Sequence, residues 1–308
     1  MIKDISIIFL SIFLESIPFL LLGCLISAII EEFVSDDTFA KLIPKNVVLG
    51  SIVGVILGFF LPACDCAVIP VAKRLIHKKV PLNVAVSFML ASPIINPVVL
   101  LSTYSAFYQT NRNLFFLRIV LGILVSLIIG IIMGIIFQKQ DVLNDKDDCD
   151  CSKEDAEIDE EFKELEKYTV QYHRFIVHFE SIIKDIGKEF FDIVKYLMIG
   201  AFLASLIQVA LPRSIMEVFS SNPVLSILVL MIFAYGISLC STSDSFVGKS
   251  LLSSFGEAGV LAYLLLGPMI DIKNTFVLFG NYKKKFVGVL LGLIFITIFF
   301  ASLVVSFL

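Results

Sequence analysis

The chain has 308 residues, of which 58% are hydrophobic and only 17% are charged. Its mean hydropathy of +0.95 excludes an ordinary soluble domain, in which about 45–50% of residues are apolar and about 25% are charged. The net charge of −4 hides an acidic segment, because residues 138–189 hold 16 of the 28 acidic residues and 8 of the 24 lysines and arginines. The remainder carries +4, which suits basic loops beside membrane spans, and no basic stripe interleaved with aromatic residues indicates nucleic acid binding.

The first part of the chain contains four apolar runs, which predict membrane spans at about 5–30, 46–62, 80–108 and 114–137. Runs of 17 or more residues are long enough to cross a hydrocarbon core about 30 Å thick. The first run carries Glu15 and lacks a small-residue cleavage site, so we expect a span rather than a removed signal peptide.

The second span is followed by the sequence LPACDCAVIP at 61–70, which places Cys64, Asp65 and Cys66 between two prolines. Each proline disrupts a helix, and lipid tolerates the freed carbonyls only where protein or a watered cavity satisfies them. On a regular helix the two thiols would diverge by about 200°, whereas a broken segment can bring both to one ion. We therefore predict a substrate site at these three residues, with Cys64 and Cys66 as ligands of a soft metal or metalloid. The alternative is that the cysteines are small buried residues that pack between helices.

Basic residues follow this motif at Lys73, Arg74, Lys78 and Lys79, and we expect them in a loop or at the membrane interface. The third span is then interrupted near its middle by the sequence SPIINP, which contains Pro93 and Asn96.

Residues 138–188 form a segment different in kind from the spans. The stretch 141–161 has too little apolar surface to offset the entropy of ordering, so it is predicted to be a flexible acidic linker on the cytoplasmic side. Apolar residues at 175–186 have roughly helical spacing, which predicts a helix along the membrane surface. Cys149 and Cys151, with His173 and His178 downstream, have metal-ligand types without a recognised zinc spacing, so a solvated linker is the preferred interpretation over metal capture.

The second half repeats the pattern of the first, with spans predicted at about 190–211, 223–239, 257–281 and 286–308. The run 286–308 shows no polar face at a 3.6-residue period, as a soluble helix would require. The predicted fold class is an all-α, polytopic transmembrane bundle of about eight spans. Its predicted parts are a first repeat at 1–137, the linker with its surface helix at 138–188, and a second repeat at 189–308.

An internal repeat is indicated by a shift of about 175 residues, which aligns Pro93 and Asn96 with Pro268 and Asp271. The same shift brings the first cysteine motif close to Cys240. Paired interruptions at matching places are typical of transporters with discontinuous helices around a central site, so we predict substrate contacts at these residues. Chance similarity between apolar segments is the alternative.

The run Cys240 to Ser245 places hydroxyls and an acid directly after an uncharged span. Ser243 and Asp244 are candidates for substrate contact, and either could equally act as the N-cap of a following helix. Asp271 is an acid inside an apolar span, where function is the default interpretation. Facing a cavity it could exchange a proton during transport, whereas pairing with Lys273 would make its role structural.

Four segments together resemble the motifs of a known protein family: the CDC motif followed by AVIPVAKRL, then ASPIINPVV, LCSTSDSFV and LGPMIDIKN. They are similar to the predicted permease family that includes the organoarsenical efflux permease ArsP and the YraQ-type proteins. The resemblance implies a multi-pass cell-membrane permease of about eight spans, some of whose relatives export trivalent organoarsenicals with cysteine involvement. It also implies functional roles for Cys64, Cys66, Pro93, Asn96, Cys240, Asp244, Pro268 and Asp271.

The leading functional hypothesis is a secondary permease that exports a small soft or thiol-reactive solute, with no cofactor. No nucleotide-binding loop is present, so a proton gradient is the simpler driver. Its expected partners are membrane lipid, the small-molecule or metalloid substrate, and a protein partner or a second copy of the chain. The first alternative is a subunit of a multi-protein complex that transports nothing alone. The second is an intramembrane enzyme with Cys64 or Cys66 as nucleophile, which is weaker because no span supplies a histidine as general base.

Overall fold

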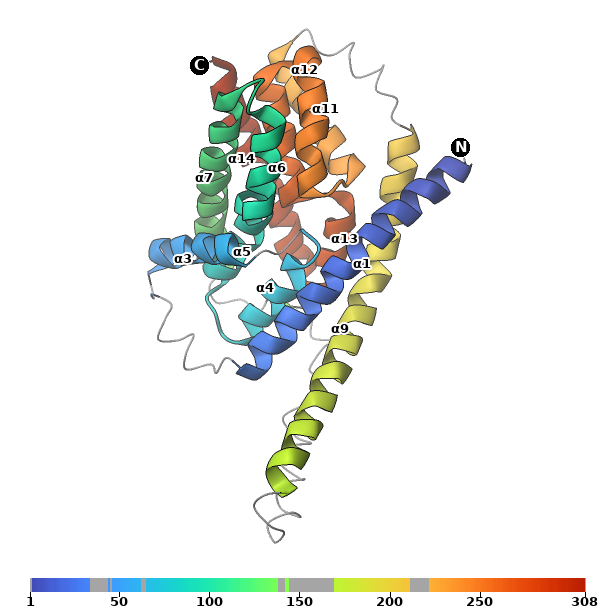
Figure 1. Ribbon diagram of the computed structural model, residues 1–308. Helices are drawn as coiled ribbons and strands as arrows, with labels where there is room; N and C mark the ends of the chain where they lie inside the picture. Colours follow the sequence, from blue (N-terminus) through green and yellow to red (C-terminus); the bar gives the residue numbers. More distant parts are fainter. Residues whose placement is uncertain are drawn as a thin grey trace.

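The computed structural model describes residues 2–33, 44, 46–61, 65–137, 142–143, 169–210 and 222–307. Regular structure in these ranges is helical apart from one β-bridge between Leu143 and Tyr282, which confirms the predicted all-α bundle. The helices, shown in Figure 1, are α1 (Ile2–Phe33), α3 (Val47–Phe60), α4 (Val68–His77), α5 (Leu82–Ile95), α6 (Pro97–Phe107), α7 (Arg112–Phe137), α9 (Thr169–Ala210), α11 (Pro223–Ile237), α12 (Ser241–Met269), α13 (Ile272–Asn281) and α14 (Lys284–Phe307).

Six stretches of the described chain are long and apolar enough to cross a membrane, and α3 and α11 are shorter apolar helices. The 14 residues of α3 and the 15 of α11 measure about 21–23 Å at 1.5 Å per residue, less than a hydrocarbon core about 30 Å thick. Each of the eight predicted spans therefore corresponds to helical structure, and two of them are short.

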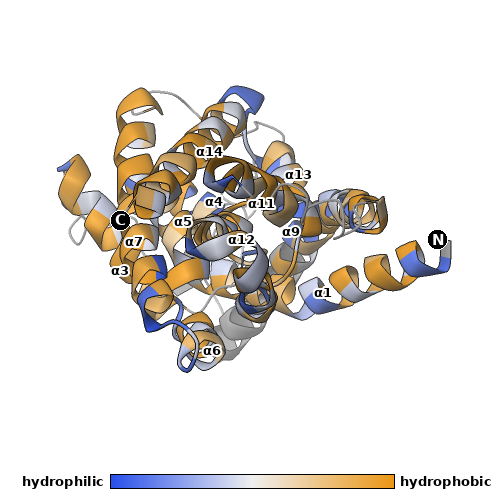
Figure 2. Ribbon diagram, turned by 90° about the horizontal axis from the view of Figure 1, so that it is seen from above, coloured by the Kyte–Doolittle hydropathy of each residue, from blue (hydrophilic) through white to orange (hydrophobic). Residues whose placement is uncertain are grey.

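The outside of the bundle is covered by large apolar side chains. Phe60, Phe116 and Phe300 are 72%, 61% and 58% exposed, and the outer helices are largely apolar in the view from above (Figure 2). Exposing such surface to water costs about 25 cal/mol per Å², a cost that hydrocarbon surroundings remove. The molecule is a multi-pass membrane protein.

Close helix packing in the first half depends on glycines. Gly50, Gly54 and Gly58 recur every fourth residue on the buried face of α3 and lie directly against α5. Gly130 and Gly134 of α7 lie against Asn83 or Ser87, the α5 residues that Gly50 and Gly54 also meet. Small residues at a helix interface let backbones approach closely, which is the main source of helix association where lipid removes the hydrophobic driving force. Helix α5 is thereby held between α3 and α7.

Two spans are broken at the predicted interruptions. Helix α5 ends at Ile95, and Asn96 turns the chain and caps α6 by accepting a hydrogen bond from the Val98 amide at 3.0 Å. In the second half α12 ends at Met269, and Asp271 caps α13 through the Asn274 amide at 2.7 Å. A side-chain acceptor at such a break satisfies one of the amide groups that a helix start leaves unpaired.

Helix α12 occupies the centre of the molecule, where it packs against α5, α6 and α7 of the first half and against α11 and α14 of the second (Figure 2). It bends at Gly256, whose φ of 72° lies in the left-handed region that favours glycine. The bend separates a first part, 241–255, from a second part, 257–269.

Helix α9 is continuous over 42 residues and extends well beyond the bundle in Figure 1. The segment 175–186, predicted as a helix on the membrane surface, lies within it and runs directly into the fifth span. His173 and His178 fall in the same helix, whereas Cys149 and Cys151 lie outside the described residues.

Candidate functional site

The turn after α3 places a carboxylate inside the molecule. Asp65, Cys66 and Ala67 form the turn that leads into α4, and Asp65 is only 3% exposed. Gly23 of α1 lies against the Ala67 backbone, so that α1 covers the turn from outside. Asp65, Cys66 and Ala67, the described part of the predicted broken segment before α4, are thus enclosed by protein, as irregular backbone at membrane depth must be.

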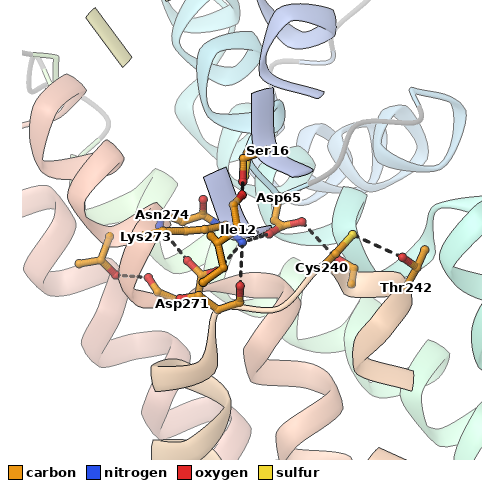
Figure 3. Close-up of polar contacts among 12 residues, drawn as sticks. Ile12, Ser16, Asp65, Cys240, Thr242, Asp271, Lys273 and Asn274 are labelled. Atoms are coloured by element: carbon orange, nitrogen blue, oxygen red, sulfur yellow. Dashed lines mark hydrogen bonds and ion pairs between the residues drawn. The ribbon is translucent and has the colours of Figure 1, made fainter. Parts of the chain in front are cut away.

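A buried ion cluster joins this turn to the second half (Figure 3). Lys273, near the start of α13, places its Nζ atom 3.1 Å from Asp65 Oδ2 and 2.9 Å from Asp271 Oδ2. All three side chains are less than 5% exposed. Such charges persist in a low-dielectric interior only when they are paired and hydrogen-bonded, and here one ammonium serves two carboxylates.

Neighbouring groups complete the cluster with hydrogen bonds. Ser241, the first residue of α12, donates to Asp65 Oδ1 at 3.2 Å, and Asn274 Nδ2 lies 3.5 Å from Asp65 Oδ2. The Lys273 ammonium also donates to the Ser238 carbonyl at 3.4 Å. Ser238 holds a left-handed conformation (φ 52°, ψ 48°) at the end of α11. That conformation costs roughly 1–2 kcal/mol, and it orients the Ser238 carbonyl to accept the hydrogen bond from Lys273, which offsets part of the cost.

Asp271 pairs with Lys273, which is the structural one of the two roles that the sequence allowed for it. Besides its ion pair with Lys273, it caps α13, and its backbone carbonyl accepts a hydrogen bond from Thr275 Oγ1 at 2.7 Å. Thr275 in turn accepts one from the Tyr235 hydroxyl of α11 at 3.1 Å. These contacts fix the residue in place and leave it poorly suited to move during a transport cycle.

A pocket lies beside the ion cluster, between α1 and the two loops that precede α4 and α12. Cys66 and Cys240, which come from the two halves of the chain, both line it. Cys66 Sγ lies 3.7 Å from Ser16 Oγ, and Cys240 Sγ lies 3.4 Å from Thr242 Oγ1. The full lining is Ile12, Glu15, Ser16, Phe19, Asp65, Cys66, Ser238, Cys240 and Lys273.

The predicted metal pair falls partly outside the described chain, because Cys64 lies beyond it. Among the described residues, no three His, Cys, Asp or Glu side chains are grouped closely enough to form a metal site. The pocket offers two thiols with a carboxylate and an ammonium close by.

A second buried polar cluster lies further along α12. Arg118 of α7, fully buried, donates through Nη1 to Thr103 Oγ1 of α6 and to Ser245 Oγ of α12, the latter at 2.8 Å. Asp244, in the first turn of α12 and 2% exposed, accepts a hydrogen bond from the Tyr263 hydroxyl at 2.9 Å.

Two basic residues predicted for a loop or interface are buried instead. Lys73 and Arg74 lie in α4, each 9% exposed, and reach the second half. Lys73 Nζ donates to Asn281 Oδ1 at 3.3 Å, and Arg74 Nη2 lies 3.6 Å from Glu189 Oε2 of α9. The prediction failed because a short amphipathic helix returns the chain inward after the turn, so these side chains join the halves.

The structure brings only some of the predicted site residues together. Asp65, Cys66, Cys240 and Asp271 surround the ion cluster or the pocket. The remaining residues lie elsewhere: Asp244 belongs to the Arg118 cluster, Ser243 is exposed, Pro93 and Pro268 lie in the last turns of α5 and α12, and Asn96 caps α6.

The capping role considered for Ser243 or Asp244 is wrong. Helix α12 already begins at Ser241, with Cys240 as its N-cap and no side-chain cap bond. Both residues therefore lie inside the first turn.

Sequence reasoning considered Lys273 only as a partner of Asp271, and it did not single out Arg118. The available signal was a charge inside an apolar run: Arg118 is the single charged residue of 114–137, whereas 257–281 holds Glu257, Asp271 and Lys273. Charges at such positions almost always face the protein interior and mark functional sites.

Comparison with known proteins agrees with this architecture. The family model ArsP_1, described as a predicted permease, matches residues 1–307. A Bacillus subtilis protein named "UPF0718 protein YcgR" is 37% identical over 304 residues, covering 98% of this chain and 97% of that protein. A Streptococcus mutans protein named "Putative two-component membrane permease complex subunit" is 35% identical over 280 residues, covering 91% and 87%. No solved structure matches the chain. The chain therefore belongs to the ArsP_1 family of membrane permeases.

Proposed function

We propose that this permease exports a small soft or thiol-reactive solute, such as a trivalent arsenical or a soft metal ion, through the pocket beside the ion cluster. The observation that carries the proposal is that Cys66 and Cys240, from opposite halves of the chain, line one pocket together with Asp65 and Lys273. Thiols prefer soft species, and a carboxylate and an ammonium can balance the charge of what binds. A substrate held from both halves would be released when the halves move apart.

The position of the pocket supports a transport role. It lies where the loop before α4 and the loop before α12 meet, close to the break between α12 and α13. Transporters commonly place their substrate sites at such breaks, at the interface of two repeats. Buried charges inside apolar spans are costly to keep, so their retention favours function over packing.

Matching features in the two halves support the proposed internal repeat. Asn46 caps α3 and Asn222 caps α11, and Asn96 and Asp271 cap the helices after the two breaks. In each pair the two positions differ by 175 or 176 residues. We infer that alternating exposure of the pocket arises from movement of one repeat against the other.

The test is transport by the purified chain in liposomes, with arsenite, methylarsenite, Zn²⁺ and Cu⁺ as separate probes. We expect one probe to be transported, and Cys66→Ser and Cys240→Ser each to reduce its initial rate about tenfold or more, which corresponds to about 1.4 kcal/mol of activation free energy. Cys24→Ser is the matched control, because Cys24 is buried in the apolar core away from the pocket lining.

Equal rates for the two pocket variants and the Cys24 control would contradict thiol involvement. Inverted vesicles that accumulate the probe, beside right-side-out vesicles that do not, would establish export. The opposite pattern would establish import and overturn the direction proposed.

A second candidate function is that of a subunit that transports only together with a separate membrane protein. It is favoured by the printed name of the S. mutans relative, which describes a subunit of a two-component complex. Affinity purification of the chain from its native membrane should then recover one partner in constant ratio. Liposomes with both proteins should transport, while liposomes with either alone should not.

A further inference from the structure

The Arg118 cluster has a property that the ion cluster lacks. In the described chain, no carboxylate lies within 4 Å of the Arg118 guanidinium, although its side chain is fully buried. Its Nη1 atom is satisfied by Thr103 and Ser245, while Nε and Nη2 are buried with no hydrogen-bond partner. A guanidinium held in this way presents its bidentate edge, the edge that best fits a carboxylate, without one in place.

Asp244 is a buried acid that likewise has no oppositely charged partner within 4 Å among the described residues. Its Oδ1 atom accepts a hydrogen bond from Tyr263, but its Oδ2 atom is buried, has no hydrogen-bond partner and points towards Gly267 of the same helix. No lysine or arginine nitrogen of the described residues lies within 4 Å of this carboxylate. Asp65 and Asp271, by contrast, share the Lys273 ammonium.

Opposite charges in a low-dielectric interior attract strongly, and the long side chain of an arginine can follow a carboxylate over several ångströms. Arg118 instead contacts neutral hydroxyl groups, while Asp244 contacts a phenol. This arrangement is expected when the carboxyl group is neutral, because a buried carboxylate without a cation is strongly disfavoured.

We propose that Asp244 binds and releases a proton during transport, and that Arg118 is the counter-ion of its ionised form. The inference rests on the proposed transport function and assigns the coupling step to this second cluster. In the proton-loaded state the Asp244 carboxyl is neutral and Arg118 is held by Thr103 and Ser245. On release, the O–H bond breaks, the proton passes to water, and the carboxylate attracts the guanidinium away from the two hydroxyls.

The groups that face Asp244 make this exchange sensitive to the state of the pocket. They are Arg118 from α7, Tyr263 from α12, Asp65 from the turn before α4, and Lys273 from α13. Ser241, which hydrogen-bonds Asp65, and Ser245, which hydrogen-bonds Arg118, lie one turn apart on α12. A shift of this first turn therefore alters both clusters, which links proton binding to solute binding.

The first test needs no transported solute. Infrared spectra of the purified, detergent-solubilised protein report the C=O stretching band of protonated carboxyl groups. At neutral pH we expect the wild type to show a band that is lost in Asp244→Asn and kept in Asp271→Asn. Glu257→Gln is the matched control, because Glu257 lies on the same helix but is exposed.

Arg118→Met provides the second variant. Without the cation, the ionised carboxylate is less favoured, so the band should persist to a pH higher by on the order of one unit or more. Tyr263→Phe removes the one hydrogen bond to Asp244 Oδ1 and little volume, so it perturbs the cluster with a smaller risk of unfolding than Arg118→Met. Size-exclusion profiles verify the folding of each variant. A spectrum unchanged by Asp244→Asn, or a wild type without the band, would overturn the proposal.

Transport then separates this inference from the function on which it depends. Asp244→Asn should still exchange labelled for unlabelled solute across the liposome membrane, while its accumulation driven by a pH gradient falls to the level without a gradient. Cys66→Ser should lose solute exchange but keep the infrared band. Loss of both exchange and gradient-driven transport in Asp244→Asn, with wild-type folding, would place Asp244 in solute binding and refute the coupling role.

Discussion

At the scale of single residues, Lys273 is the centre of the candidate site. It is the one described cation within 4 Å of either Asp65 or Asp271, and it also reaches the Ser238 carbonyl. A buried ion cluster adds little net stability when complete, because desolvation offsets the attraction of its charges. Removing one member is far more costly, because the remaining charges stay buried without compensation.

Lys273→Met should therefore lower the free energy of unfolding by about 3–5 kcal/mol, the range found when a buried ion pair loses one partner. Thermal unfolding in detergent, followed by size exclusion, would measure the loss. Lys249→Met on the exposed side of α12 is the matched control and should leave the midpoint close to wild type. Adding Asp65→Asn to Lys273→Met should recover part of the loss, and no recovery would argue against direct charge coupling.

The acids of the cluster could be predicted from the sequence, and so could the pairing of Lys273 with Asp271 two residues away, but the contact of Lys273 with Asp65 could not. Asp65 lies between two cysteines and two prolines, and Asp271 follows a paired interruption, so local pattern marks both. Lys273 comes from a position 208 residues away from Asp65. Such a contact depends on tertiary packing, which run length and composition do not specify.

At the scale of secondary structure, the glycine face of α3 decides how closely the first half can pack. A Cβ atom at Gly54 would overlap the Val84 carbonyl oxygen of α5, which is backbone and cannot move aside as a side chain can. The two helices would have to separate, and Asp65 lies only five residues beyond the end of α3.

Gly54→Ala should accordingly destabilise the protein by about 1–3 kcal/mol, as overpacking of a close interface does. Gly288→Ala in α14 is the control, because a Cβ there meets nothing within 4 Å, so its higher helix propensity should leave stability unchanged or slightly raised. Melting temperatures of the two variants in the same detergent would compare them. Equal melting temperatures would show that α3 and α5 tolerate separation.

Helix breaks were easier to predict than helix lengths. Asn96 and Asp271 were recognisable because prolines and polar residues interrupt apolar runs there. The fusion of 175–186 with the fifth span into one helix was not foreseen, because helical spacing of apolar residues does not reveal whether neighbouring helical segments join. The bend at Gly256 could not be predicted either, because an isolated glycine is tolerated inside many helices without bending them.

At the scale of the whole molecule, α12 unites the two halves. It belongs to the second half but packs against α5, α6 and α7 of the first, and its first turn hydrogen-bonds Asp65 and Arg118. Run lengths alone could predict where the apolar helices lie, six of which, among the described residues, are long enough to cross a membrane, because crossing a bilayer is a one-dimensional requirement. The packing of α12 among the helices of the first half depends on tertiary contacts, which run lengths do not specify.

Cutting the connection between the halves should therefore not separate them. A protease site inserted at residue 155, outside the described residues, would allow cleavage after folding. With an affinity tag on the first half, we expect the second half to co-purify in equal amount in mild detergent. An intact chain without the site controls for incomplete cleavage, and recovery of the tagged half alone would contradict the packing described.

The length of α9 has a mechanical consequence. Its 42 residues measure about 63 Å at 1.5 Å per residue, roughly twice the thickness of a hydrocarbon core, so a large part of it must stand clear of the bilayer. Further along the same helix, Gly200 lies directly against the backbone of Lys273. The helix therefore connects the region beyond the hydrocarbon core to the backbone of Lys273, so that a displacement of its outer end would be transmitted to the neighbourhood of the central cation.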